Sequence, residues 1–283
     1  MSLPAYAGPL ERTWYYSYRV ICGLIFLFLI APILVIIPLS FNHEPYFTFT
    51  REMLHLDPAG YSLRWYNAFF SSEEWLHSIR NSFIIGISAT VLATALGTLA
   101  ALGLSRQDMP YRNLFMGLLI SPMIVPLIIS GAGMYFFYSS LHLTHTYIGV
   151  ILAHTALGTP FVVITVTATL VGFDASLPRA AASLGADPTR TFFKVIMPLI
   201  LPGVISGALF AFITSFDEVV IVLFLAGHDQ RTIPLEMWSG IREQISPTIL
   251  AVATMLVIIS VMLLTTLELL RRRNERLRGM SPG

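Results

Sequence analysis

Two adjacent carboxylates, Asp217 and Glu218, stand inside a strongly apolar stretch of the chain. An ionisable side chain within a membrane is costly unless it faces protein or water, so such a residue marks a candidate functional position. We predict that Ser215, Phe216, Asp217 and Glu218 line or gate a translocation pathway. Because neighbours on an ideal helix point about 100° apart, one carboxylate can instead form a structural hydrogen bond with another helix.

The other residues that could do chemistry form no recognisable catalytic or metal-binding pattern. The sequence has no HxxH or HExxH spacing, and the histidines are mostly scattered over predicted outer loops. It also lacks a GxxxxGK[ST] phosphate-binding motif, so ATP hydrolysis is expected in a separate subunit. We therefore predict no catalytic residue, no metal site and no cofactor in this chain, with ATP and magnesium bound by a partner.

Composition places most of the chain in a membrane. Of 283 residues, 55% are hydrophobic and only 12% are charged, against roughly 25% charged in ordinary soluble domains. The net charge of +1 argues against a nucleic-acid partner, because phosphate binding needs a concentrated basic face. The single cysteine, Cys22, cannot form a disulfide within the chain. The predicted fold class is all-α, a polytopic protein.

Six stretches have the length of about 20 mostly apolar residues that a membrane-spanning helix needs. They are approximately residues 20–41, 82–104, 114–138, 147–171, 199–225 and 248–270. With the N-terminus inside the cell, 12 of the 17 basic residues fall on the cytoplasmic side, as the positive-inside rule favours. Both termini are then cytoplasmic. We predict a cytoplasmic segment at 1–19, a six-helix domain at 20–270 and a basic cytoplasmic tail at 271–283.

Two predicted outer segments, residues 42–81 and 226–247, are too long to be plain turns. The first contains an aromatic-rich amphipathic pattern at residues 63–70, which is typical of a helix lying in the membrane interface. Such a helix can anchor the chain or dock a partner, and the sequence leaves both alternatives open. Prolines and glycines recur inside the spans, Pro122 and Pro126 among them, and such residues break or bend membrane helices.

The predicted cytoplasmic loop at residues 174–197 carries the most specific pattern. Ser176 is a candidate N-cap, Pro178 fits a first helical turn, and Gly185 can adopt the left-handed conformation that closes a helix. Asp187 and Pro188 then start a second short helix that runs through Phe192 and Phe193. A short helix with small side chains, held between two spans, can seat in a groove of another protein.

This segment resembles the cytoplasmic signature of type I ABC importer permeases, which reads Glu-Ala-Ala, three residues, Gly, nine residues, Ile, one residue, Leu-Pro. The Glu position of that signature holds Arg179 here, which reverses a charge. The matching positions, with the spacing intact, are Ala180, Ala181, Gly185, Val195, Met197 and Pro198. The resemblance implies the permease fold and a coupling helix that docks into an ATPase, comprising Arg179, Ala180, Ala181, Ala182, Ser183, Leu184, Gly185 and Ala186.

The stretch Ser215–Ile221 also resembles the fifth span of permeases from spermidine and putrescine importers. The resemblance implies a small amine-like or amino-acid-like cargo, for which a carboxylate offsets the loss of hydration. It also implies a second homologous permease, two ATP-binding cassette ATPase subunits, an extracytoplasmic solute-binding protein and a bacterial inner-membrane location. The alternative is an ion-coupled secondary transporter that uses Asp217 and Glu218, for which internal repeats would be expected.

Overall fold

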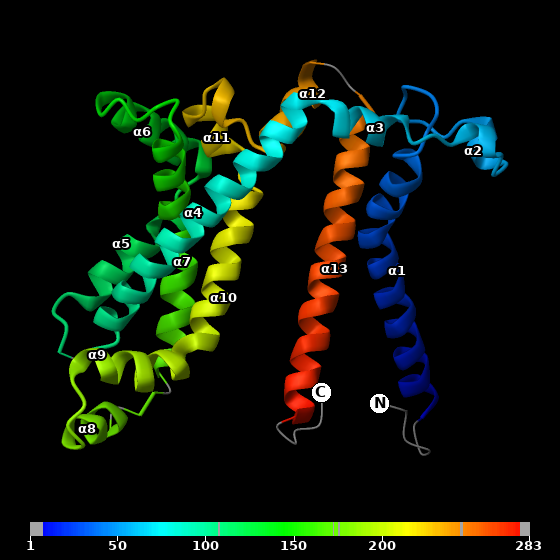
Figure 1. The fold of residues 1–283 in the computed structure, drawn as a ribbon. Helices are drawn as coiled ribbons and strands as arrows, with labels where there is room; N and C mark the ends of the chain where they lie inside the picture. The colour runs from blue at the N-terminus through cyan, green and yellow to red at the C-terminus, as the bar shows by residue number, and fades with distance from the viewer. Residues whose placement is uncertain (1–7, 107, 172, 175, 244–245, 278–283) are drawn as a thin grey trace. The chain divides into compact units, whose positions relative to one another are not determined.

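The computed structural model describes residues 8–277 except 107, 172, 175 and 244–245, without the side chains of 243, 263–264 and 266–277. Within these residues the chain is helical and contains no β-strand; a single bridge pairs Asn42 with Tyr61. The chain divides into two compact units, residues 1–72 with 240–283, and residues 73–239. Figure 1 shows the helices of each unit.

The first unit contains α1 (Pro9–Leu39), α2 (Arg51–Leu54), η1 (Pro58–Gly60), α3 (Arg64–Ser71) and α13 (Thr248–Leu277). The amphipathic pattern predicted at residues 63–70 is confirmed as α3, which buries Trp65 and Phe69 and packs against α13. Asn42 joins α1 to this helix, because its carbonyl oxygen accepts a hydrogen bond from Trp65 Nε1 at 2.8 Å.

The second unit holds the remaining elements, except that the last residues of α12, from Gly240, belong to the first unit. They are α4 (Glu73–Leu104), α5 (Arg112–Ile124), α6 (Leu127–Ser140), α7 (Tyr147–Val171), α8 (Ser176–Ser183), α9 (Pro188–Thr191), η2 (Phe192–Ile196), α10 (Met197–Phe216), α11 (Val220–Leu225), η3 (His228–Gln230) and α12 (Ile233–Glu243). Helices α4, α7 and α10 pack against one another and form the centre of the unit.

Glycines allow these three helices to approach closely. A Cβ atom at Gly207 of α10 would lie 2.8 Å from the Cα atom of Val162 in α7. One at Gly97 of α4 would lie 2.7 Å from the Val162 Cβ atom. Small residues serve this purpose in membrane helices, where van der Waals contact between backbones drives association.

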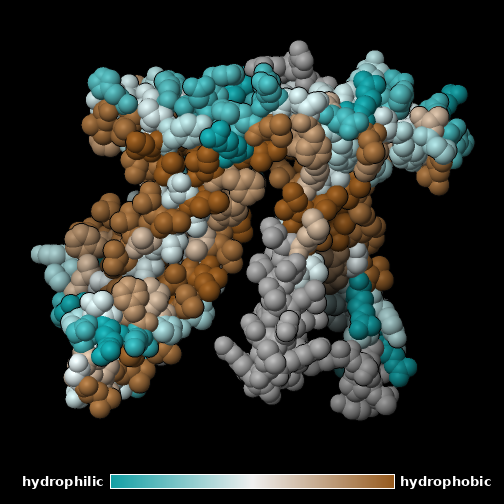
Figure 2. Space-filling view, viewed as in Figure 1, coloured by the Kyte–Doolittle hydropathy of each residue, from teal (hydrophilic) through white to brown (hydrophobic). Residues whose placement is uncertain are grey.

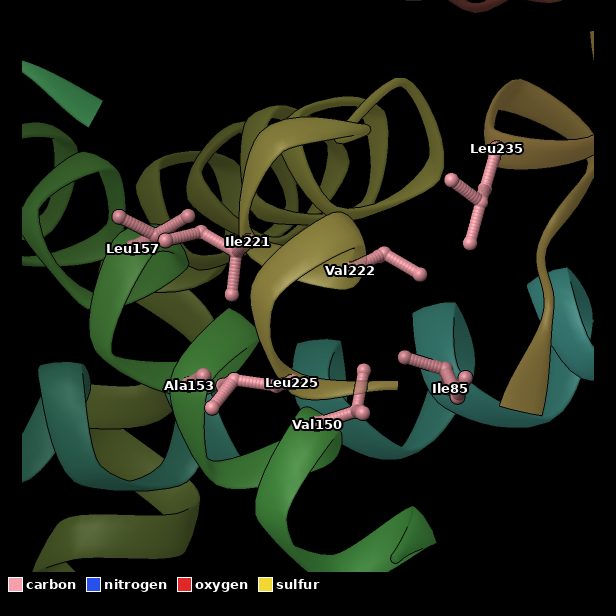
Figure 3. Packing of buried hydrophobic residues seen from close by; sticks show 8 residues of the cluster. All are labelled: Ile85, Val150, Ala153, Leu157, Ile221, Val222, Leu225 and Leu235. Atoms are coloured by element: carbon pink, nitrogen blue, oxygen red, sulfur yellow. The ribbon is translucent and has the colours of Figure 1, made fainter. Parts of the chain in front are cut away.

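Two apolar clusters fill the unit. One cluster contains Val162, Val166 and Ile200, with alanines of α4 and α10. The other is drawn in Figure 3 and comprises Ile85, Val150, Ala153, Leu157, Ile221, Val222, Leu225 and Leu235. Short helix α11 contributes three of these side chains and so fixes the chain after the end of α10.

Large apolar side chains also cover the outside of the second unit. Leu99, Ile128 and Phe136 are each more than 60% exposed. In Figure 2, hydrophobic residues gather over α4, α5, α7 and α10, and hydrophilic residues lie toward the ends of these helices. A soluble protein rarely leaves so much apolar surface uncovered, so lipid or other membrane subunits must cover it.

Four helical stretches among the described residues have the length and composition to cross a membrane: α1, α4, α7 and the continuous stretch Pro188–Phe216. Helices α5 and α6 qualify together but bend by 105° at their junction. The last predicted span falls in α13, whose side chains lie partly outside the described residues. The count of six crossings and the side of the termini remain predictions.

Two spans predicted as continuous helices are interrupted in the structure. The third breaks at Val125 and Pro126, where Pro126 has no N–H to continue the helical ladder. The fifth breaks between Phe216 and Val220. Both breaks leave backbone groups without partners in their own helix, so other groups must satisfy them in a membrane.

Candidate functional site

The predicted coupling segment folds as α8 and the turn that follows it. Ser176 is not the N-cap that we expected but the first residue of the helix. The Asp174 carboxylate accepts the Ser176 backbone N–H at 2.8 Å instead. This hydrogen bond lowers the pKa of Asp174, because the backbone N–H stabilises the ionised carboxylate. The sequence contains two residues that can cap this helix, Asp174 and Ser176, and the Asp174 carboxylate is the one that accepts the hydrogen bond.

The end of α8 closes as predicted. Gly185 has φ of +82°, a conformation that glycine adopts without steric cost. The Gly185 N–H donates to the Ala182 carbonyl oxygen at 2.9 Å, and the Ala186 N–H donates to the Ala181 carbonyl oxygen at 3.0 Å. This pair of bonds is the Schellman motif, which satisfies the last carbonyl groups of a helix.

None of the residues of α8 is buried, and most of them are exposed. Ala180 and Ala182 are exposed, and Leu184 directly after the helix is 88% exposed. A small-residue surface with two exposed leucines, Leu177 and Leu184, offers another protein both close approach and apolar side chains to cover.

The second short helix begins as predicted at Pro188, and the Asp187 carboxylate caps it by accepting the Arg190 N–H at 2.8 Å. It does not end at Phe193. It passes through a π-helical turn, Phe192–Ile196, directly into α10. The coupling segment is thus attached to a helical stretch of 29 residues.

Replacing Asp174 tests how α8 is held. Because its carboxylate accepts the Ser176 N–H, Asp174→Ala should open the first turn of α8 and speed amide exchange there, by about fivefold for loss of a cap. Since binding of this N–H depresses the pKa, the capping contribution is present above the ordinary pKa and disappears as the pH falls through the lowered value. Hydrogen exchange measures the effect, and exchange in α9 should not change. Equal exchange at Ser176 in both proteins would contradict this account.

At the opposite end of the same helical stretch, the two carboxylates have different surroundings. Asp217 is exposed, and its N–H donates to the Ile213 carbonyl oxygen at the last turn of α10. Glu218 is only 7% exposed, and its Oε1 atom accepts the Ile221 N–H at 2.9 Å. Glu218 therefore satisfies a backbone group at the start of α11.

The neighbours of this break include residues that sequence reasoning did not single out. Buried Ser215 lies 2.7 Å from Nδ1 of His154, a buried residue of α7. The Phe216 ring packs against Phe83 of α4 with 5.5 Å between centroids, and equally closely against Phe212. His154 and Phe83 lie far from residue 215 in sequence, so only their place on packed helices brings them to this site.

The second unit combines closely packed helices, an exposed helix between two spans and a broken span that carries a carboxylate. The chain belongs to the family described as binding-protein-dependent transport system inner membrane component, whose model matches residues 93–276. It is a permease subunit of an ABC importer, a multi-pass membrane protein and a transport component rather than an enzyme.

Individual relatives cover most of the chain. It is 29% identical over 251 residues to the spermidine/putrescine transport system permease protein PotC of Haemophilus influenzae, covering 89% of this chain and 95% of the relative. It is 32% identical over 241 residues to the putrescine transport system permease protein PotI of Escherichia coli strain K12, covering 82% of each.

Among solved structures, the fold is similar to a bacterial ABC transporter involved in the import of the acidic polysaccharide alginate. The TM-score is 0.75 at 15% identity, over 94% of this chain and 99% of that one. A structure of the alginate transporter with a pentasaccharide-bound periplasmic protein matches with a TM-score of 0.68 at 14% identity, over 93% and 96%. These similarities support the type I ABC importer permease fold.

Proposed function

We propose that the chain forms half of the translocation pathway for a small amine, polyamine-like or amino-acid-like, and couples to a separate ATPase through α8. The single observation that carries the coupling role is α8 itself, capped at both ends, without a buried residue and joined to the helical stretch of α10 after one turn. A displacement of such a helix by the ATPase would move α10 through one short connection, whereas a flexible loop would change shape without moving α10.

The proposed complex contains a second homologous permease, two ATPase subunits that bind ATP and magnesium, and an extracytoplasmic solute-binding protein. In this arrangement the chain crosses the bacterial inner membrane six times with both termini in the cytoplasm. The ion-coupled alternative has no further observation in its favour, because the chain belongs to a family of ABC importer components. Purification with the neighbouring gene products tests the proposal: no associated ATPase, or transport without ATP, would contradict it.

The amine cargo is supported by the exposed carboxylate of Asp217 at the end of a membrane helix. An alkylammonium group loses hydration in a membrane, and a carboxylate beside the pathway offsets that loss. Relatives named for spermidine and putrescine transport point to the same class. The alginate transporter shares only the fold at 15% identity and therefore carries no argument about cargo.

We expect substitutions of Asp217 and Glu218 to differ in their effect on the KM for uptake. Asp217→Asn should raise the KM for amine uptake by about tenfold, the size of one lost charge-assisted hydrogen bond, and leave assembly intact. Glu218→Gln preserves an oxygen that can accept the Ile221 N–H, so its effect on KM should be smaller. Uptake of labelled putrescine into proteoliposomes measures both. Unchanged kinetics in Asp217→Asn would remove this residue from the pathway.

A further inference from the structure

A polar cavity of about 310 Å³ opens in the second unit, and its lining includes no residue of either segment described above. Its wall comes from the first turns of α4, from η3 and from the start of α12. The lining residues are Glu73, Glu74, His77, Ser78, His228, Asp229, Arg231 and Glu236. A volume of this order is at the lower end of those that hold small ligands.

Hydrogen bonds beneath the cavity fix its wall. Asn81 Nδ2 donates to the backbone carbonyl oxygens of Asp229 and Arg231, both at 2.8 Å. The Tyr147 hydroxyl lies 2.7 Å from Asn81 Oδ1 and 2.8 Å from the Asp229 carbonyl oxygen. The Ser82 hydroxyl accepts the Ile233 N–H at 2.9 Å. The loop from η3 to α12 is thereby held on α4, which preorganises the cavity for a ligand.

The charge of the cavity is negative. The only basic side chain in its lining that is always charged, Arg231, lies 3.3 Å from Glu236, and these two charges offset each other. The carboxylates of Glu73, Glu74 and Asp229 remain, and no hydrogen bond to any of them is found within the described residues. Glu73 and Glu74 also suit the first turn of α4, whose amide dipoles favour negative charge. That preference explains two of the carboxylates but not Asp229.

Ser78 provides an independent indication that the cavity holds a ligand. It lines the cavity, is 1% exposed, and its hydroxyl has no hydrogen-bond partner within the part of the chain that the structure describes. A hydroxyl that lines a cavity and has no partner in the protein can accept a hydrogen bond from a ligand that donates one. His77 lies beside it, with Nδ1 3.3 Å from Asn81 Nδ2.

The ligand that fits these acceptors is an organic cation. Among the described residues no group of three or more His, Cys, Asp or Glu side chains is arranged to hold a metal ion. The carboxylates of the lining, together with the Ser78 hydroxyl, suit the three N–H donors of a primary ammonium group.

We propose that this cavity binds a primary ammonium group of the transported amine, an inference that rests on the amine cargo proposed above. The cavity lies at the Tyr147 end of α7, whereas α8 follows the Val171 end, about 37 Å away along that helix. It is therefore at the end of the second unit opposite the proposed ATPase contact, where solute from a binding protein would arrive. The cation binds in the cavity first and then reaches Asp217.

The test measures binding of labelled spermidine to the purified importer complex without its binding protein. The double variant Glu73→Gln with Asp229→Asn should weaken spermidine binding by about tenfold or more, as loss of charge-assisted hydrogen bonds predicts. The matched control Glu44→Gln with Glu52→Gln removes two exposed carboxylates from the first unit and should bind like the wild type. Ser78→Ala, which removes one hydroxyl without loss of helix propensity, should weaken binding about threefold and serves if the double variant fails to assemble.

Each outcome has one meaning. Equal spermidine binding by the wild type and the assembled cavity variants, or no binding by the wild type, overturns the cavity site. A cavity variant that binds spermidine normally but loses affinity for the solute-binding protein also overturns it, because a side chain of that protein would then be the occupant. Spermidine uptake by the complete wild-type importer is measured separately. Absent uptake with cavity-dependent binding would overturn the proposed cargo and leave the site standing.

Discussion

Ala181→Glu is expected to release the ATPase from the permease. Ala181 lies in the middle of α8, on a helix with no buried residue, and its half-buried side chain is a single methyl group. A glutamate there would place an unpaired charge in the proposed contact, which typically costs an interface 2–5 kcal/mol. We therefore expect the affinity for the ATPase to fall by at least about 30-fold, and solute-dependent ATP hydrolysis to fall with it. Co-purification and ATPase assays measure both quantities.

The matched control is Ser139→Glu, which adds the same charge to an exposed position near the end of α6. It should leave ATPase binding unchanged. Membrane insertion of both variants should match the wild type, because each change lies at an exposed or half-exposed position in a short helix or near a helix end. Normal assembly and transport by the Ala181 variant would remove the coupling role from α8.

Gly207→Val should prevent α10 from packing on α7. A Cβ atom at this position would lie 2.8 Å from the Val162 Cα atom and 2.5 Å from the Thr165 hydroxyl oxygen. The first of these atoms is backbone, so no side-chain rotation relieves the contact and the helices must move apart. Overpacking of this kind costs about 1–3 kcal/mol or more. We expect a lower midpoint of thermal unfolding in detergent and a lower yield of folded protein.

Gly133→Val is the control for this change. Gly133 is in α6, and a Cβ atom there would meet nothing within 4 Å. Both substitutions introduce the same β-branched residue into a helix, so they share its cost in helix propensity. A similar loss of stability in the two variants would show that propensity and not close packing sets the effect at Gly207.

Local sequence signals predicted the coupling segment well. Gly185 takes the left-handed conformation and Pro188 begins the next helix, because each depends on the residue type and its immediate neighbours. The N-cap was predicted wrongly, since Asp174 and Ser176 are both suitable residues and only the path of the chain decides between them. Local chemistry therefore identifies a helix end to within about two residues but not always the group that caps it.

The surroundings of the carboxylates could not be predicted in this way. The sequence left open whether Glu218 lines a pathway or forms a hydrogen bond, because that depends on where α10 stops. Apolar residues on both sides of 217–219 give one stretch long enough for a span, and this conceals the break. The same limit applies to the third span, where Pro126 signalled a bend but its size of 105° depends on packing against other helices.

The π-helical turn at Phe192–Ile196 changes which side chains of α10 lie on the same helix face as those of α9. Such a turn holds one residue more than an α-helical turn, and this offset rotates every later side chain by about 100° relative to a regular helix. A helical wheel drawn from Pro188 therefore assigns the wrong face to positions beyond Met197. The helix faces used to choose scanning substitutions or cysteine pairs in α10 should therefore be counted from Met197. The periodic pattern of their effects should be shifted by one residue from the pattern extrapolated from α9.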